Sequence, residues 1–175
     1  WGKPPEKNRR LRLLFKIQRP IITTYYKSNR YDLFMKHNLF NIASLHQAIE
    51  TVINEVKNDG LPPITVAIVD KEGNLVYFYK MDATPSRTIN ISISKAYTSV
   101  KMLSSTKDFN TRLHNERVTI IDFQDLKLTS IAGGIPIRID DALVGGIGIS
   151  GRKPDDDHKV AERILEEMIR CAANN

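Results

Sequence analysis

Apolar residues recur at intervals of three and four over three segments of the chain, and this period predicts helices. The first helix is predicted to run to about Lys57, with Asn41 or Ser44 as its cap. The second covers about 89–103 and the third about 155–173, where a proline and three aspartates suit a helix start. A further short helix is predicted over 106–115. The pattern over 116–124 is ambiguous, because charged residues flank a strand-like apolar run.

Other apolar segments are short and predict strands. Ile64–Val69 is apolar at nearly every position, which is typical of a strand covered on both faces, and Leu75–Met81 follows it after a turn. Three more strands are predicted over 126–131, 135–139 and 143–150. Strands joined by short turns, with helices before and after them, indicate an α+β fold in which helices pack on an antiparallel sheet.

The chain is organised around the glycine-rich segment Gly133–Gly151. In its last strand, Gly146, Gly148 and Ser150 share one face, while isoleucines occupy the other. Glycine weakens a strand and marks a place where something approaches the backbone closely. The sequence therefore predicts that a helix, a ligand or another subunit covers this glycine face.

Charge is distributed unevenly and divides the chain in two. Residues 1–34 contain nine Lys/Arg and two Asp/Glu, whereas 35–175 contain seventeen and eighteen, so the net charge of +6 comes from the first segment. We expect 1–34 to be a basic extension outside the fold and 35–175 to be one folded domain. A balanced domain offers no basic patch for nucleic acid, so nucleic-acid binding is not expected.

Two further features bear on the compartment. A single cysteine excludes an internal disulfide and suits a reducing environment, so a cytoplasmic location is expected, although the basic extension is also compatible with a targeting segment. No apolar run approaches the roughly 20 residues that span a bilayer, so no transmembrane segment is expected.

The best polar pair is Lys95 and Thr98, which point the same way from the second predicted helix. Either both face solvent, or Lys95 neutralises an acidic group of a ligand while Thr98 offers an oxygen. His46 lies beside the apolar stripe of the first helix, where it is either a half-buried structural histidine or a ligand of haem iron.

Two apparent motifs are set aside. The glycines around 145–151 lie in a strand, and the helix after them opens with aspartates, which would repel phosphate. Asp155, Asp156, Asp157 and His158 are contiguous and cannot converge on one metal ion, so helix capping is the simpler role. No nucleophile or acid–base pair can be picked out, and we expect binding rather than catalysis.

Six short motifs together resemble a known family: VAIVDKEGNLV, KMDA, SKAYTS, AGGIPI, GGIGISG and PDDDHKVA. In this order and at this spacing they are similar to the GlcG/HbpS family, also called the haem-degrading domain family, which includes the C-terminal domain of PduO-type proteins. The resemblance covers roughly 40–173. It implies a profilin- or PAS-like fold with a five-stranded antiparallel sheet, and homo-oligomers of six or eight subunits.

The resemblance also implies site residues. Lys95 and Thr98 match the family's KAxT, while Gly133, Gly134 and Pro136 match its GGxP. Family haem contacts include a threonine in some members and a first-helix histidine in others, and the counterparts here are Thr98 and His46. Lys80 stands where the family usually has arginine, so an anion-binding role is not carried over to it.

Three functions follow from these patterns. The resemblance implies an oligomer that binds haem or a related tetrapyrrole and aids its sensing or degradation. The alternatives are binding or turnover of a small hydroxy acid or diol with Lys95 as anion partner, and an assembly module that has no ligand.

Overall fold

The computed structural model describes residues 41–139 and 141–173, and the basic extension 1–34 lies outside this part. Helices and strands follow one another in the order α2 (Ile42–Lys57), β1 (Thr65–Asp70), β2 (Leu75–Lys80), α3 (Arg87–Lys101), α4 (Thr106–Glu116), the 3₁₀ helix η1 (Ile120–Phe123), β3 (Gly134–Ile139), β4 (Ala142–Ser150) and α5 (Pro154–Ala173). The predicted helices and their order are confirmed, with ends that differ by one or two residues.

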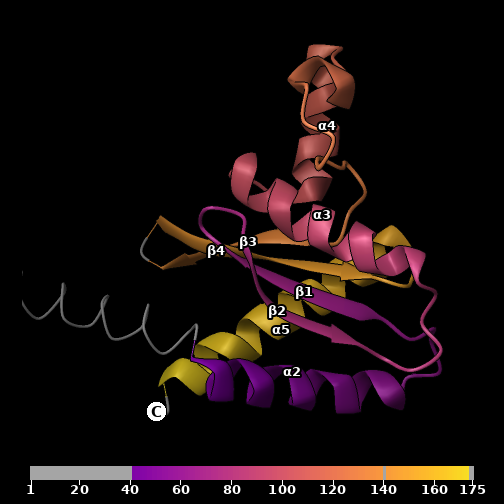
Figure 1. Ribbon diagram of the computed structural model, residues 1–175, viewed down its shortest axis with the longest axis vertical. Coiled ribbons are helices and arrows are strands. Elements are labelled where there is room, and N and C mark those ends of the chain that lie inside the picture. Colours follow the sequence, from indigo (N-terminus) through magenta and orange to yellow (C-terminus); the bar gives the residue numbers. More distant parts are fainter. Residues whose placement is uncertain (1–40, 140, 174–175) are drawn as a thin grey trace, which may run out of the picture.

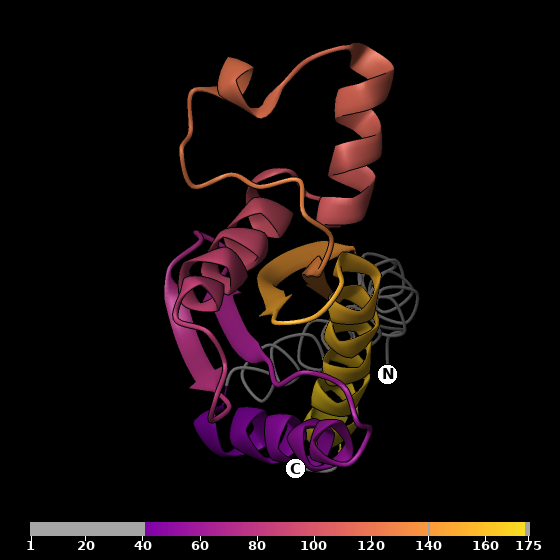
Figure 2. The same cartoon turned by 90° about the vertical axis from the view of Figure 1, so that its right-hand side faces the viewer.

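One antiparallel sheet with the strand order β2-β1-β4-β3 forms the centre of the described fold. Helix α3 packs on one face of this sheet, and α2 and α5 cover the other (Figures 1 and 2). Strand β1 is buried on both faces, as its apolar run predicts. The α+β class with helices on an antiparallel sheet is therefore confirmed.

The expectation of five strands is wrong for the described residues, because the sheet has four. Residues 126–131, predicted as a strand, form a loop instead. The amide of Thr129 donates to the hydroxyl of Thr98, and the amide of Ile131 donates to the hydroxyl of Thr129. Threonine hydroxyls therefore accept the hydrogen bonds that a neighbouring strand would otherwise accept from these amides. The pattern of apolar residues does not reveal such side-chain acceptors.

The first helix is capped by Asn41, whose side chain accepts a hydrogen bond from the amide of Ala43 at 2.9 Å. Ser44, the other candidate cap, lies inside α2 and is buried. Apolar residues at steps of three and four give α2 a stripe that faces the sheet and α5. The members of that stripe are Leu45, Ala48, Ile49, Val52, Ile53 and Val56.

The glycine face of β4 is covered by α3, which confirms that something approaches it closely. A Cβ at Gly146 would lie 2.5 Å from the hydroxyl oxygen of Ser99, and one at Gly148 would overlap the backbone of Ser92 and Ala96. On the opposite face, Ile147 and Ile149 enter the core shared with α2 and α5. The absence of side chains on this face of β4 therefore allows a helix of the same chain to pack closely against it.

Helix α4 and η1 form an arm that projects away from the sheet (Figure 2). Phe109 of α4 and Phe123 of η1 pack edge-to-face with 5.4 Å between ring centroids, which gives the arm a small core of its own. The arm is anchored at its base, where the amide of Gly134 donates to the hydroxyl of Thr106. Helix α4 thereby leaves the body at the start of β3.

Candidate functional site

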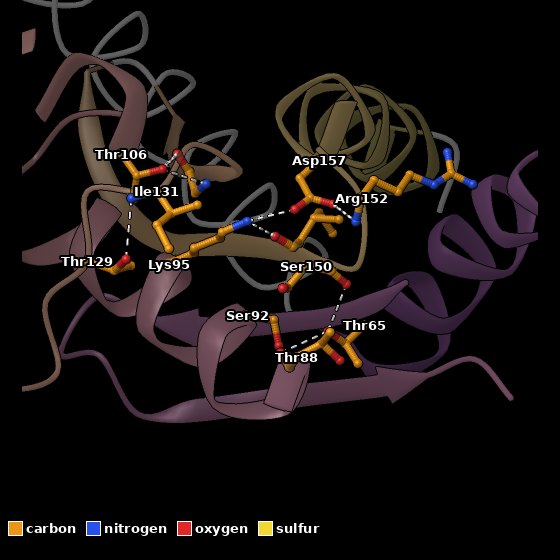
Figure 3. Close-up of polar contacts among 12 residues, drawn as sticks. Thr65, Thr88, Ser92, Lys95, Thr106, Thr129, Ile131, Ser150, Arg152 and Asp157 are labelled. Carbon is orange, nitrogen blue, oxygen red and sulfur yellow. Dashed lines mark hydrogen bonds and ion pairs between the residues drawn. The ribbon is translucent and has the colours of Figure 1, made fainter. Parts of the chain in front are cut away.

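The side chain of Lys95 is buried between α3 and α5, and this excludes the interpretation that it faces solvent. It is 1% exposed, and its Nζ donates to Asp157 Oδ2 and to the carbonyl of Ile149, each at 2.7 Å (Figure 3). Asp157 in turn accepts from the amide of Arg152 at 3.0 Å. A buried ion pair therefore ties α3 to the first turn of α5 at the end of β4.

Burial dominates the electrostatics of this pair. Desolvation lowers the pKa of Lys95, and the nearby Asp157 charge offsets this only in part. Desolvation likewise raises the pKa of Asp157 against the attraction of Lys95. The pair is therefore costly to keep charged and depends on both partners being present.

Gly133 and Gly134 complete the packing around this pair. Gly133 has a φ of +120°, and a Cβ there would lie 2.8 Å from Lys95 Nζ and from Asp157 Cβ. A Cβ at Gly134 would overlap the backbone of Lys95. Pro136 continues along β3, which is an edge strand and can accommodate proline. Their role as ligand contacts stays a prediction.

Thr98 is fully buried, and its hydroxyl has two partners. Its Oγ1 donates to the carbonyl of Ser94 at 2.7 Å and accepts from the amide of Thr129 at 2.9 Å. Thr98 therefore holds the loop that returns from the arm. A haem iron could reach this oxygen only if that loop moved away.

His46 lies on the other side of the sheet, on α2, and the structure does not bring it together with Lys95 or Thr98 (Figure 1). Its side chain is exposed, and Nδ1 lies 3.0 Å from the hydroxyl of Tyr77 on β2. A groove of about 180 Å³ runs beside it. The groove is lined by His46, Ile49, Glu50, Ile53, Asn54, Lys57, Tyr77 and Tyr79.

These contacts separate two kinds of residue. Lys95 and Thr98 are buried with their polar groups bonded to other parts of the protein, and Gly133 and Gly134 pack against Lys95. His46, by contrast, presents an imidazole at an open groove. Among the described residues, no group of three or more His, Cys, Asp or Glu side chains is arranged to hold a metal ion. The aspartates at the start of α5 have separate partners, Lys107 for Asp155 and Lys159 for Asp156.

Three residues that make contacts around the buried ion pair and the groove were not identified from the sequence. Asp157 was placed in a helix cap, yet it is the partner of Lys95. Arg152 binds Asp59 through both terminal nitrogens and joins the end of β4 to the end of α2. Tyr77 carries the contact with His46, and its only signal was its place in a run of three aromatic residues on a predicted strand. No helix in the described part of the chain has the length and apolar character needed to cross a bilayer.

Comparison with known proteins gives a consistent result. Residues 40–166 match the family model described as haem degrading protein HbpS-like. An uncharacterised 15.0 kDa protein of Citrobacter freundii is 25% identical over 69% of this chain and 83% of its own length. Protein GlcG of Escherichia coli is 29% identical over 50% of this chain and 63% of its own length.

Solved structures share the fold. A PduOC:haem complex superposes with a TM-score of 0.65 at 22% identity, covering 73% of this chain and 93% of the other. A double mutant of HbpS from Streptomyces reticuli gives 0.64 at 24% identity, covering 72% and 84%. At this level of identity, the likeness is one of fold.

Proposed function

Because the chain belongs to the HbpS-like haem-degrading family, we propose that it binds haem or a related tetrapyrrole in the groove between α2 and β2, with His46 as the iron ligand. The observation that carries the proposal is the exposed imidazole of His46 at a groove that is also bordered by the rings of Tyr77 and Tyr79. One of the solved structures that share this fold is a complex with haem, which supports a tetrapyrrole as ligand.

The residues around the groove suit the chemistry of haem. An imidazole is a common axial ligand of haem iron. Tyr77 and Tyr79 are half-buried and provide aromatic rings on which a flat macrocycle can pack, whereas Ile49 and Ile53 are almost fully buried and contribute little surface. Lys57, at the end of α2, offers a cation for a propionate. Haem would supply the iron and its redox chemistry, while these residues bind and orient it.

Thr98 is the weaker candidate for the iron ligand. Its hydroxyl is buried and bonded to both Ser94 and Thr129, so iron would have to displace at least one of these contacts. Lys95 is likewise committed to Asp157, which weighs against the alternative of a small hydroxy acid held by its ammonium group. Neither residue offers a free polar group at a groove.

The groove also suggests that one subunit covers haem only in part. About 180 Å³ is less than the roughly 300–1,000 Å³ of pockets that enclose a drug-sized ligand. We therefore propose that the protein forms a homo-oligomer and that a second copy covers the remainder of the macrocycle. Light scattering with and without haemin checks this, and a protein that is monomeric in both conditions would contradict it.

Haemin titration followed by the Soret band tests the proposed ligand. We expect saturable binding by the unaltered protein and an affinity at least about tenfold weaker in His46→Ala, because the iron loses its protein ligand. The matched variant Thr98→Val should keep the wild-type spectrum. Equal affinity and identical spectra for His46→Ala and the unaltered protein would show that the iron is bound elsewhere or not at all.

A further inference from the structure

We propose that Tyr77 is a positioning residue for His46, holding its ring so that Nε2 is the nitrogen available to a metal. This inference rests on the proposed function. It concerns a contact between two elements that are far apart in sequence: His46 lies on α2, and Tyr77 lies 31 positions later on β2. The contact is the hydrogen bond of 3.0 Å between Nδ1 and the phenol hydroxyl.

The sheet fixes the position of Tyr77 independently of the helix. Tyr77 is paired with Ile68 of β1, and its ring is half-buried against the core on the α2 side. The ring centroids of Tyr77 and His46 lie 6.5 Å apart and are tilted by 48°. An exposed imidazole on a helix surface otherwise rotates freely, so a bond to a rigid strand reduces the entropy lost when a ligand binds.

The bond assigns different roles to the two ring nitrogens. Nδ1 is taken by Tyr77, and among the described residues Nε2 has no hydrogen-bond partner. In a metal-bound imidazole, the nitrogen that does not bind the metal carries a proton and donates it to a neighbouring acceptor. The oxygen of Tyr77 is the acceptor in reach, so Nε2 is left for the iron.

The hydroxyl of Tyr77 can form a hydrogen bond with Nδ1 of His46 whether or not Nδ1 carries a proton. A phenol hydroxyl carries one proton and has lone pairs, so it can both donate and accept a hydrogen bond. A neutral phenol donates to an unprotonated Nδ1 in the free protein and accepts from Nδ1–H once Nε2 binds a metal. Accepting that proton makes the imidazole a more basic ligand.

Tyr79 provides a matched control. It lies two residues along β2, packs against the same core on the same face and lines the same groove. No hydrogen bond joins it to His46. Replacing either tyrosine with phenylalanine removes one hydroxyl and leaves the ring in place, so a difference between the two variants reports the bond to His46 and not the loss of an aromatic wall.

The experiment compares Tyr77→Phe and Tyr79→Phe in the full chain by haemin titration and by the midpoint potential of the bound iron. We expect Tyr77→Phe to weaken haemin affinity by about tenfold, at the lower end of the effect of outer contacts on metal ligands. The midpoint potential should move to a more positive value, because a less basic imidazole stabilises the ferric state less. Tyr79→Phe should match the unaltered protein in both measurements.

A measurement without haem tests the same contact. The ¹⁵N chemical shifts of the His46 ring in the ligand-free protein should change in Tyr77→Phe and stay constant in Tyr79→Phe. Equal affinities, potentials and ring shifts in the two variants would overturn the inference. If His46→Ala abolishes haemin binding while Tyr77→Phe behaves as wild type, only the positioning role fails. If His46→Ala also binds haemin normally, the proposed function fails.

Discussion

Replacing Lys95 with methionine is expected to lower the free energy of unfolding by about 3–5 kcal/mol. The change removes the ammonium that neutralises Asp157 in a site where both side chains are almost completely buried. Asp157 would remain as an uncompensated buried carboxylate, and the carbonyl of Ile149 would lose its donor. Urea unfolding followed by circular dichroism measures the loss.

A second substitution separates charge from packing. Lys95→Met combined with Asp157→Asn removes both charges and keeps an oxygen for the amide of Arg152. We expect the double variant to be more stable than Lys95→Met alone, because the isolated charge, and not the lost attraction, is the larger cost. Lys107→Ala, which breaks an exposed ion pair with Asp155, is the control and should change stability far less. A double variant less stable than the single would contradict this account.

Replacing Gly148 with alanine is expected to destabilise the fold by about 3 kcal/mol or more, at the upper end of overpacking costs. Its Cβ would overlap the carbonyl of Ser92 and the amide of Ala96, which are backbone atoms of α3. Backbone atoms cannot move aside by a side-chain rotation, so α3 as a whole would have to move away from the sheet. Thermal and urea unfolding measure the effect.

Gly60→Ala is the matched control for this prediction. Gly60 has a φ of +73°, yet nothing lies within 4 Å of an added Cβ. Its substitution therefore adds backbone strain alone, at about 1–2 kcal/mol. A Gly148→Ala variant no less stable than Gly60→Ala would show that α3 does not rest on the bare face of β4.

The two sides of the sheet thus have different tasks. On the α3 side, the glycines of β4 let a helix pack against the backbone, and the pair Lys95–Asp157 ties that helix to α5. On the α2 side, His46 and Tyr77 border a groove. Changes on the α3 side should therefore act first on stability, and changes at the groove should act first on the proposed binding.

Much of the fold could be predicted from the chain because periodicity is a local property. The stripe of α2 and the apolar run of β1 each follow from side-chain geometry within one element. The glycine face of β4 was also local, since alternation along a strand shows which face is bare. The loop at 126–131 was mispredicted, because hydroxyls of Thr98 and Thr129 satisfy its amides, and one of them lies about 30 positions away.

The sequence by itself determined the helices and their order, the bare face of β4 and the family, all of which depend on residue types at short spacing. Only the tertiary structure decided that a helix covers the glycines, that Asp157 is the partner of Lys95, and that His46 lies on the opposite side of the sheet beside Tyr77. The physical reason is that these contacts join residues 31 to 62 positions apart. Whether two such side chains meet depends on how the helices and strands pack against one another. The spacing of apolar residues within a single helix or strand does not contain this information.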